Sequence, residues 1–221
     1  MGLISRKIKQ AFVLSFQNKC IKLVCQAHDA LCGCHAITPD MDEETISACI
    51  YESVMKNQYT IEQGIHVDIE HRLLTVGYIQ TPKPSKQLSR IDFHFEADCW
   101  ELTSFARFNY FMEAKNLYEY DFRKSSNKST TRAKYYFTRY IETGIDHIIN
   151  GDYPSNSIIL GYVLVGDINP VVDGINSELS FQNRSSEHLF NVSSSYECNI
   201  RGTFSSNHPL GRVDHLMLKF T

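Results

Sequence analysis

The sequence has no long apolar segment and no excess of basic residues. No window of about 18 uninterrupted apolar residues occurs in the 221-residue chain, so no membrane span is expected. The first ten residues, MGLISRKIKQ, lack the apolar region and small-residue cleavage site of a secretory signal peptide. We therefore expect a cytoplasmic protein whose seven cysteines are reduced. The formal net charge of −3 argues against a surface that is basic throughout, as in proteins that coat nucleic acid.

Several motifs that mark common enzyme classes are also missing. There is no glycine-rich phosphate loop of the nucleotide-binding folds, no His-Glu-x-x-His zinc motif and no Gly-x-Ser-x-Gly elbow of hydrolases. The segment Cys32-Gly33-Cys34-His35 offers zinc-ligand residue types, but no second pair follows at zinc-finger spacing. Ordinary small core side chains are the favoured interpretation there. The tail around His208 and His215 carries polar residues that match no motif.

Apolar periodicity divides the chain into alternating helical and extended segments. Helices are expected over residues 4–32, 42–56, 131–150 and 170–181, and strands over 73–79, 88–96, 107–117, 158–165, 192–204 and 213–220. Residues 57–72 fit neither the helical nor the strand periodicity clearly. This order predicts one α/β or α+β domain over residues 1–221, with a central sheet flanked by helices.

Three charged residues lie within the central strands. Asp92 interrupts the alternating run of residues 88–96, and Glu113 and Lys115, two positions apart, share one face of the strand at 107–117. If these strands pair, Asp92 lies beside Glu113, and two adjacent carboxylates require a proton or cation between them. Mg²⁺, or Mn²⁺ in its place, suits such an oxygen-ligand pair. The alternative is an ordinary ion pair between Glu113 and Lys115 on a solvated face.

The spacing Ile91-Asp92 … Glu113-Ala114-Lys115, on adjacent strands after an N-terminal helix, resembles the PD-(D/E)xK nuclease superfamily. Ile91 stands where a proline often precedes the first acid. The resemblance covers about residues 41–165 and implies an α/β, restriction endonuclease-like core with a mixed sheet, to which residues 170–221 add a helix and strands. It implies that Asp92 and Glu113 bind Mg²⁺ and that Lys115 assists the attacking water. A further acid from the first core helix is expected, with Glu44 preferred over Glu52.

The same resemblance implies a substrate and partners. It implies an endonuclease that hydrolyses phosphodiester bonds in DNA, with RNA less favoured, as the effector of a prokaryotic defence or repair system. A homodimer or a partner protein would supply the second active site or target recognition.

Basic residues follow the second acidic strand and are candidates for binding substrate phosphates: Lys124, Lys128, Arg132, Lys134 and Arg139. They would equally suit the solvated face of a helix. A second hypothesis is therefore a catalytically silent module of the same fold that binds nucleic acid or a partner protein.

Overall fold

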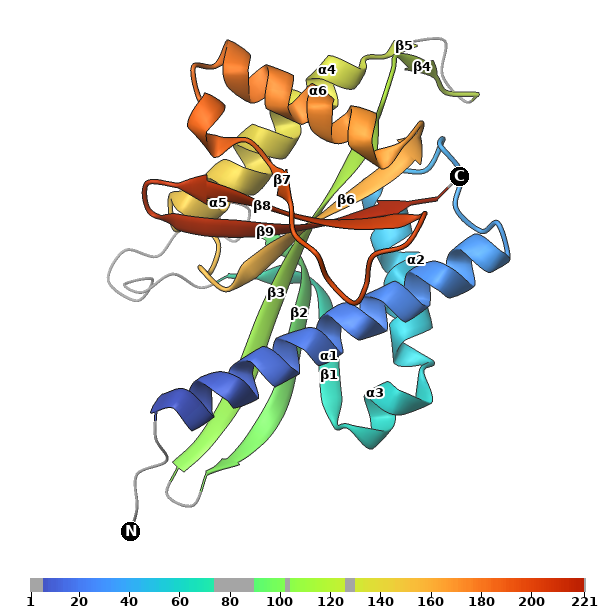
Figure 1. The fold of residues 1–221 in the computed structure, drawn as a ribbon. Helices are drawn as coiled ribbons and strands as arrows, with labels where there is room; N and C mark the ends of the chain where they lie inside the picture. Colours follow the sequence, from blue (N-terminus) through green and yellow to red (C-terminus); the bar gives the residue numbers. More distant parts are fainter. Residues whose placement is uncertain (1–5, 74–89, 102–103, 126–129, 221) are drawn as a thin grey trace.

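The computed structural model describes residues 6–73, 90–101, 104–125 and 130–220, and its centre is one mixed sheet of seven strands (Figure 1). The strand order is β1-β2-β3-β6-β9-β8-β7. The strands are β1 Ile65–Arg72, β2 Arg90–Glu101, β3 Ser104–Tyr118, β6 Ser157–Val165, β7 Phe190–Asn191, β8 Arg201–His208 and β9 Gly211–Lys219. The pairs β3·β6 and β6·β9 are parallel and the other neighbours are antiparallel. A separate two-stranded ribbon joins β4 Phe122–Arg123 to β5 Thr130–Thr131.

The middle of the sheet is set by the apolar run of β6. All nine residues of β6 are buried, which fits a strand covered on both faces and paired with parallel neighbours. Gly161 in this strand has almost no free space, because a Cβ placed there would lie 2.3 Å from Met217 Sδ and 2.8 Å from Leu117 Cδ1. The side chains of Met217 and Leu117 therefore fill the space beside Gly161, and a side chain there would force them to move.

Helices from the two halves of the chain cover the sheet on opposite sides (Figure 1). The first group is α1 Arg6–Gly33, α2 Glu43–Met55 and α3 Gln58–Glu62, and the second is α4 Ala133–Tyr140, the π-helical turn η2 Ile141–Ile145, α5 Asp146–Ile149, α6 Ile168–Phe181 and the 3₁₀ turn η3 Ser185–Glu187. Asp42 caps α2, because its Oδ1 accepts a hydrogen bond from Thr45 N at 2.8 Å. This cap fixes where α2 starts, and with it the position of the acidic residues in its first turn.

The expected α/β class is confirmed, with a mixed sheet flanked by helices, whereas the restriction endonuclease-like core stays a prediction. Residues 57–72, which fitted neither period, form α3 and β1. The helix expected over 131–150 is interrupted by η2, and the strand expected over 192–204 is only partly extended, with β8 beginning at Arg201. The strand expected over 73–79 lies outside the described residues, apart from Leu73. No helix in the described part of the chain is long and apolar enough to cross a membrane.

Candidate active site

The candidate site forms where β2 and β3 stop pairing. The antiparallel register runs from Glu101 opposite Ser104 to Phe93 opposite Met112. One step beyond that end stand Asp92 and Glu113, and Glu113 is already aligned with Ile159 of β6. Asp92 Oδ2 accepts a hydrogen bond from Ala114 N at 2.6 Å, so this acid is fixed to the backbone between Glu113 and Lys115.

Lys115 connects the acids of this cluster. Its ammonium donates to Glu113 Oε1, to Glu43 Oε1 at 3.3 Å and to the Ala114 carbonyl at 2.8 Å. Glu43 Oε2 also accepts from Asn116 N at 3.1 Å. Asp92, Glu113 and Lys115 are each at least nine-tenths buried, with 9%, 4% and 4% of their surface exposed. The structure therefore brings together the three residues singled out in the sequence and adds Glu43 as a fourth member.

The helix acid in contact with Lys115 is Glu43, which the sequence interpretation did not consider. Glu44, the preferred candidate, is the next residue of α2; it is exposed and makes no contact with Lys115. Glu52, the other candidate, is exposed and pairs with Lys56 at 2.5 Å. The acidic pair after the Asp42 cap was visible in the sequence, but the rotation of α2 against the sheet decides which of the two points inward.

Burial and mutual repulsion control the protonation of the cluster. Burial raises the pKa of Asp92 to about 6, with Lys115 opposing the shift and Glu43 adding to it. Burial also raises the pKa of Glu113. For Lys115, burial works toward a lower pKa, but the carboxylates of Glu113, Glu43 and Asp92 outweigh it, and the pKa of its ammonium is raised. Lys115 therefore stays protonated at neutral pH, and its charge stabilises the surrounding acids.

The donor set fits a hard divalent cation. Three carboxylates against one ammonium leave an excess of two negative charges when all are ionised. Glu113 Oε2 is buried and has no hydrogen-bond partner within the described part of the chain, although a buried carboxylate oxygen ordinarily has one. Oxygen atoms from Asp92 and Glu113 are the ligands that Mg²⁺ prefers, so these residues suit the ion expected from the sequence.

The π-helical turn η2 packs beside Lys115. A Cβ added at Gly144 would lie 3.4 Å from Ile159 Cδ1 and 3.9 Å from Lys115 Cγ. The turn therefore covers the aliphatic part of Lys115, while the ammonium faces the acids. Single π turns within helices are frequent at functional sites.

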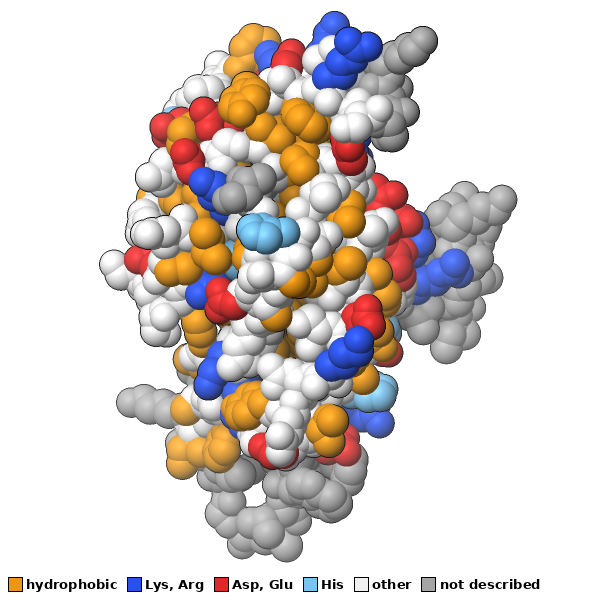
Figure 2. Space-filling model, turned by 90° about the vertical axis from the view of Figure 1, so that its right-hand side faces the viewer, with side chains coloured by type: hydrophobic (Ala, Val, Ile, Leu, Met, Phe, Trp, Pro, Cys, Tyr) orange, Lys and Arg blue, Asp and Glu red, His pale blue; other side chains and the backbone are white. Residues whose placement is uncertain are grey.

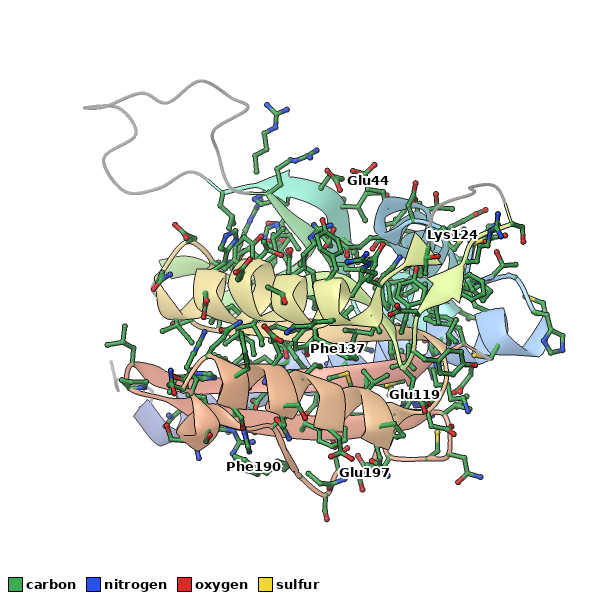
Figure 3. The ribbon with its side chains drawn as sticks, turned by 90° about the horizontal axis from the view of Figure 1, so that it is seen from above. Glu44, Glu119, Lys124, Phe137, Phe190 and Glu197 are labelled. Atoms are coloured by element: carbon green, nitrogen blue, oxygen red, sulfur yellow. The ribbon has the colours of Figure 1, made fainter. Side chains whose placement is uncertain are left out.

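A polar pocket opens next to Glu43, at the start of α2. Its lining residues are Asp42, Glu43, Glu44, Asn116, Lys124, Tyr136 and Arg139. Figure 3 shows Glu44 and Lys124 on the same side of the molecule, with Phe190 and Glu197 on the opposite side. Two of the five basic residues proposed to bind phosphate, Lys124 and Arg139, thus lie in the same pocket as Glu43.

The other basic candidates are placed differently. Lys134 pairs with Glu178 at 3.5 Å and stands over the Phe181 ring at 4.4 Å, so it is directed toward α6. Arg132 is exposed immediately before α4. Lys128 lies outside the described residues. On the face drawn in Figure 2, basic side chains are interspersed with acidic and apolar ones and form no continuous patch.

The tail histidines belong to a buried hydrogen-bond chain that sequence reasoning missed. Ser206 Oγ lies 2.7 Å from His208 Nε2 and 2.8 Å from His215 Nε2, and His208 Nδ1 lies 2.6 Å from Glu187 Oε2. Tyr140 Oη lies 2.8 Å from His215 Nδ1. Ser206, His208 and Glu187 have the connectivity of a serine-hydrolase triad, but Ser206 has no exposed surface. A substrate cannot reach a fully buried nucleophile. These hydrogen bonds therefore have a structural role, which is to join η3, β8 and β9.

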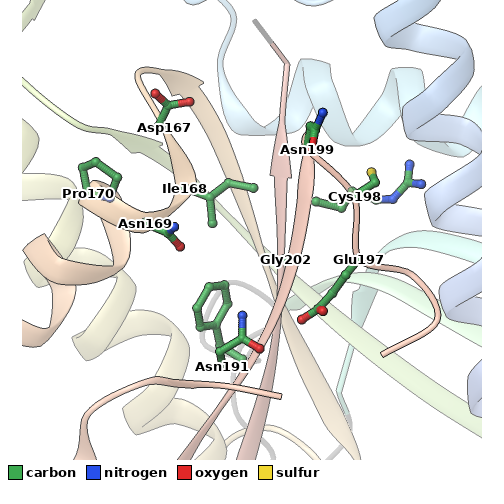
Figure 4. Close-up of a pocket in the computed structure, with 11 residues that line it drawn as sticks. Asp167, Ile168, Asn169, Pro170, Asn191, Glu197, Cys198, Asn199 and Gly202 are labelled. Atoms are coloured by element: carbon green, nitrogen blue, oxygen red, sulfur yellow. The ribbon is translucent and has the colours of Figure 1, made fainter. Parts of the chain in front are cut away.

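A second pocket lies between the start of α6 and β8 (Figure 4). Its charged residues already have partners. Asp167 pairs with Lys219 at 2.5 Å, Arg201 with Asp29, and Glu197 Oε1 accepts from Thr203 Oγ1 at 3.3 Å. The pocket beside Glu43 is therefore the better candidate for charged ligands.

The fold and the acidic cluster define an α/β protein with a candidate metal centre where strands β2 and β3 of its sheet stop pairing. In comparisons with known proteins, no family model, curated protein or solved structure matched this chain. The resemblance to PD-(D/E)xK nucleases therefore stays a prediction that rests on the residues and their geometry.

Proposed function

We propose that this protein is a Mg²⁺-dependent nuclease that hydrolyses phosphodiester bonds in DNA. The observation that carries the proposal is the cluster of the buried acids Asp92 and Glu113 and the partly exposed Glu43 around Lys115, in which Glu113 Oε2 has no hydrogen-bond partner among the described residues. An ordinary surface ion pair does not bury two acids and an ammonium, with a third, partly exposed acid in contact, where two strands stop pairing.

Each residue of the cluster has a distinct role in this proposal. Asp92 and Glu113 would hold the cation, since both are buried and present carboxylate oxygens. The bound metal supplies Lewis acidity and lowers the pKa of water. Lys115 stabilises negative charge that develops on the phosphate, because its raised pKa makes it a poor base at neutral pH. Glu43 orients the Lys115 ammonium through their 3.3 Å contact.

The pocket next to the cluster provides a place for substrate. Lys124 and Arg139 lie in its lining with Glu43, so phosphates bound there would lie near the acids. A single active site on one chain would cut one DNA strand at a time. Cleavage of both strands would use a homodimer or a partner protein, as in the defence and repair nucleases that the sequence resembles.

A catalytically silent module is the second candidate. It is favoured by the hydrogen bonding of Lys115, because its ammonium already donates to three oxygen atoms. A fully paired ammonium is also what a structural ion cluster would show. The two candidates differ in whether DNA is cut or only bound.

The test combines cleavage and binding measurements. Plasmid, linear duplex, single-stranded DNA and RNA would each be incubated with the wild type in Mg²⁺ or Mn²⁺, alongside Glu113→Gln and Lys115→Met. We expect cleavage of DNA by the wild type and a loss of at least about 100-fold in both variants. Glu52→Gln, an exposed acid of α2 paired with Lys56, is the matched control and should cleave normally.

The outcomes separate the candidates. Cleavage that persists in both variants would place the chemistry elsewhere. Binding of DNA without cleavage under any metal condition would support the silent module. Comparing the cleavage rates of Glu43→Gln and Glu44→Gln shows which helix acid the reaction needs. We expect the larger loss of cleavage with Glu43→Gln.

A further inference from the structure

A second group of metal-ligating side chains lies at the edge of the sheet, on β1 and β2. Ligand atoms of Asp68, His71 and His94 all lie within 4.8 Å of one another. The Nδ1 atoms of His71 and His94 are each 3.9 Å from Asp68 Oδ2. The group contains two imidazoles, unlike the oxygen-only set of Asp92 and Glu113.

An unusual backbone conformation creates this group. Asp68 and His71 are three residues apart on one strand, and regular alternation would place them on opposite faces. Glu70 between them has a φ of 55°, in the left-handed region that non-glycine residues rarely adopt. This distortion of β1 brings His71 next to Asp68 and His94. Backbone strain of this kind concentrates at functional sites.

The His94 ring is held with one nitrogen directed into the group. Its Nε2 lies 2.7 Å from Asn109 Oδ1, while Asn109 Nδ2 donates to the Arg107 carbonyl at 3.3 Å. The ring is also stacked on Phe111, with centroids 4.7 Å apart and planes 8° apart. Since Asn109 presents its oxygen to the ring, Nε2 carries the proton and Nδ1 presents a lone pair.

Among the residues that the structure describes, that Nδ1 atom has no hydrogen-bond partner, although only 6% of the surface of His94 is exposed. The Asp68 carboxylate, another acceptor, lies 3.9 Å from it. Two acceptors facing each other at 3.9 Å need a proton or a metal cation between them, and with the ring proton on Nε2 the position in front of Nδ1 suits a metal. The Asn109 contact that orients the ring is the outer-shell arrangement common to metal-bound histidines.

We infer that Asp68, His71 and His94 form a binding site for a transition-metal divalent cation, with Zn²⁺ the best fit. Two imidazole nitrogens and one carboxylate oxygen suit Zn²⁺, and three protein ligands leave a fourth position for water. At bond lengths of about 2.0–2.1 Å, tetrahedral ligands lie about 3.3 Å apart, so the 3.9 Å separations must shorten by roughly half an ångström. Asp68 has an exposed side chain and can make that movement.

Such an ion would hold the edge strand β1 against β2. His94 lies two residues from Asp92 on the same face of β2, and Glu70 is among the charges that raise the pKa of Asp92. The site is nevertheless separate in its ligands from the proposed Mg²⁺ centre, and it stands whether or not the chain cuts DNA.

The test measures metal binding directly. Metal-free protein would be titrated with ZnCl₂ by calorimetry and with CoCl₂ by visible absorption, because tetrahedral Co²⁺ gives intense bands that report its ligands. We expect one tight site in the wild type and an affinity at least about tenfold weaker in Asp68→Asn and in His71→Gln. These two residues are exposed or half-buried, so their variants should fold. His94→Gln is a third variant, read only if its circular dichroism is native.

Matched controls give each outcome a meaning. His66→Gln, an exposed histidine of β1, should bind as the wild type does, and so should Glu113→Gln, which alters only the proposed Mg²⁺ centre. No tight Zn²⁺ or Co²⁺ binding by the wild type would overturn the inference. Unchanged affinity in both Asp68→Asn and His71→Gln, or a Co²⁺ spectrum with thiolate charge-transfer bands from the cysteines, would overturn it as well.

Discussion

Replacing Asp92 by asparagine should stabilise the metal-free protein at neutral and alkaline pH. Burial raises the pKa of Asp92 from its ordinary value of 3.8 to about 6. The native state therefore holds a proton that the unfolded chain releases, and its stability falls as the pH rises between these two values. A shift of about two units corresponds to about 3 kcal/mol over the whole range. Asparagine cannot ionise, and its amide oxygen can still accept from Ala114 N.

The measurement is the free energy of unfolding in urea, with a chelator present, for the wild type and Asp92→Asn. Between about pH 5 and pH 8 the variant should gain about 1.4 kcal/mol relative to the wild type, with most of the change below about pH 7. Groups unaffected by the substitution cancel in the difference. Glu113 increases this pH-dependent difference further, because the charge of Asp92 helps to raise the pKa of Glu113 in the wild type.

Mg²⁺ should reverse this order at pH 8. At one thousand times the dissociation constant of Mg²⁺ the wild type gains about 4.1 kcal/mol, which exceeds its deficit of about 3 kcal/mol, and Asp92→Asn gains much less. A difference between the two proteins that does not change with pH would refute the argument from burial. Equal stabilisation of both by Mg²⁺ would show that Asp92 is not a ligand.

Two further predictions concern packing and phosphate binding. Gly161→Ala should lower the free energy of unfolding by about 1–3 kcal/mol in thermal or urea denaturation, because its Cβ would collide with Met217 Sδ and Leu117 Cδ1. Gly33→Ala, where space is open, should change the free energy of unfolding by less than about 1 kcal/mol. Equal effects of the two substitutions would contradict the packing argument. Arg139→Ala should weaken DNA binding, measured by fluorescence anisotropy, and reduce its salt dependence by about one charge. Lys134→Ala should bind DNA nearly as the wild type does, because the Lys134 ammonium is directed at Glu178 and Phe181. The reverse order of effects would place the DNA on the α6 side.

Much of the candidate site could be predicted from local sequence patterns. Alternation along residues 88–96 and 107–117 determines that Asp92 shares a face with His94, and Glu113 with Lys115, because side chains in a strand alternate between faces. The cap at Asp42 determines where α2 begins, because its carboxylate satisfies a backbone N–H in the first turn. These features depend on neighbours within a few residues, which is why the sequence alone could indicate them.

Other features were decided only by the tertiary structure. Glu43 and Glu44 are adjacent in α2 and chemically alike, and only the packing of α2 on the sheet turns Glu43 toward Lys115. Asp68 and His71 meet because Glu70 adopts a left-handed conformation, which no residue preference in this segment would predict. Ser206, His208 and Glu187 are joined by the packing of η3 on β8. Contacts between distant segments depend on how whole elements pack, and the local periodicity of a sequence does not contain that information.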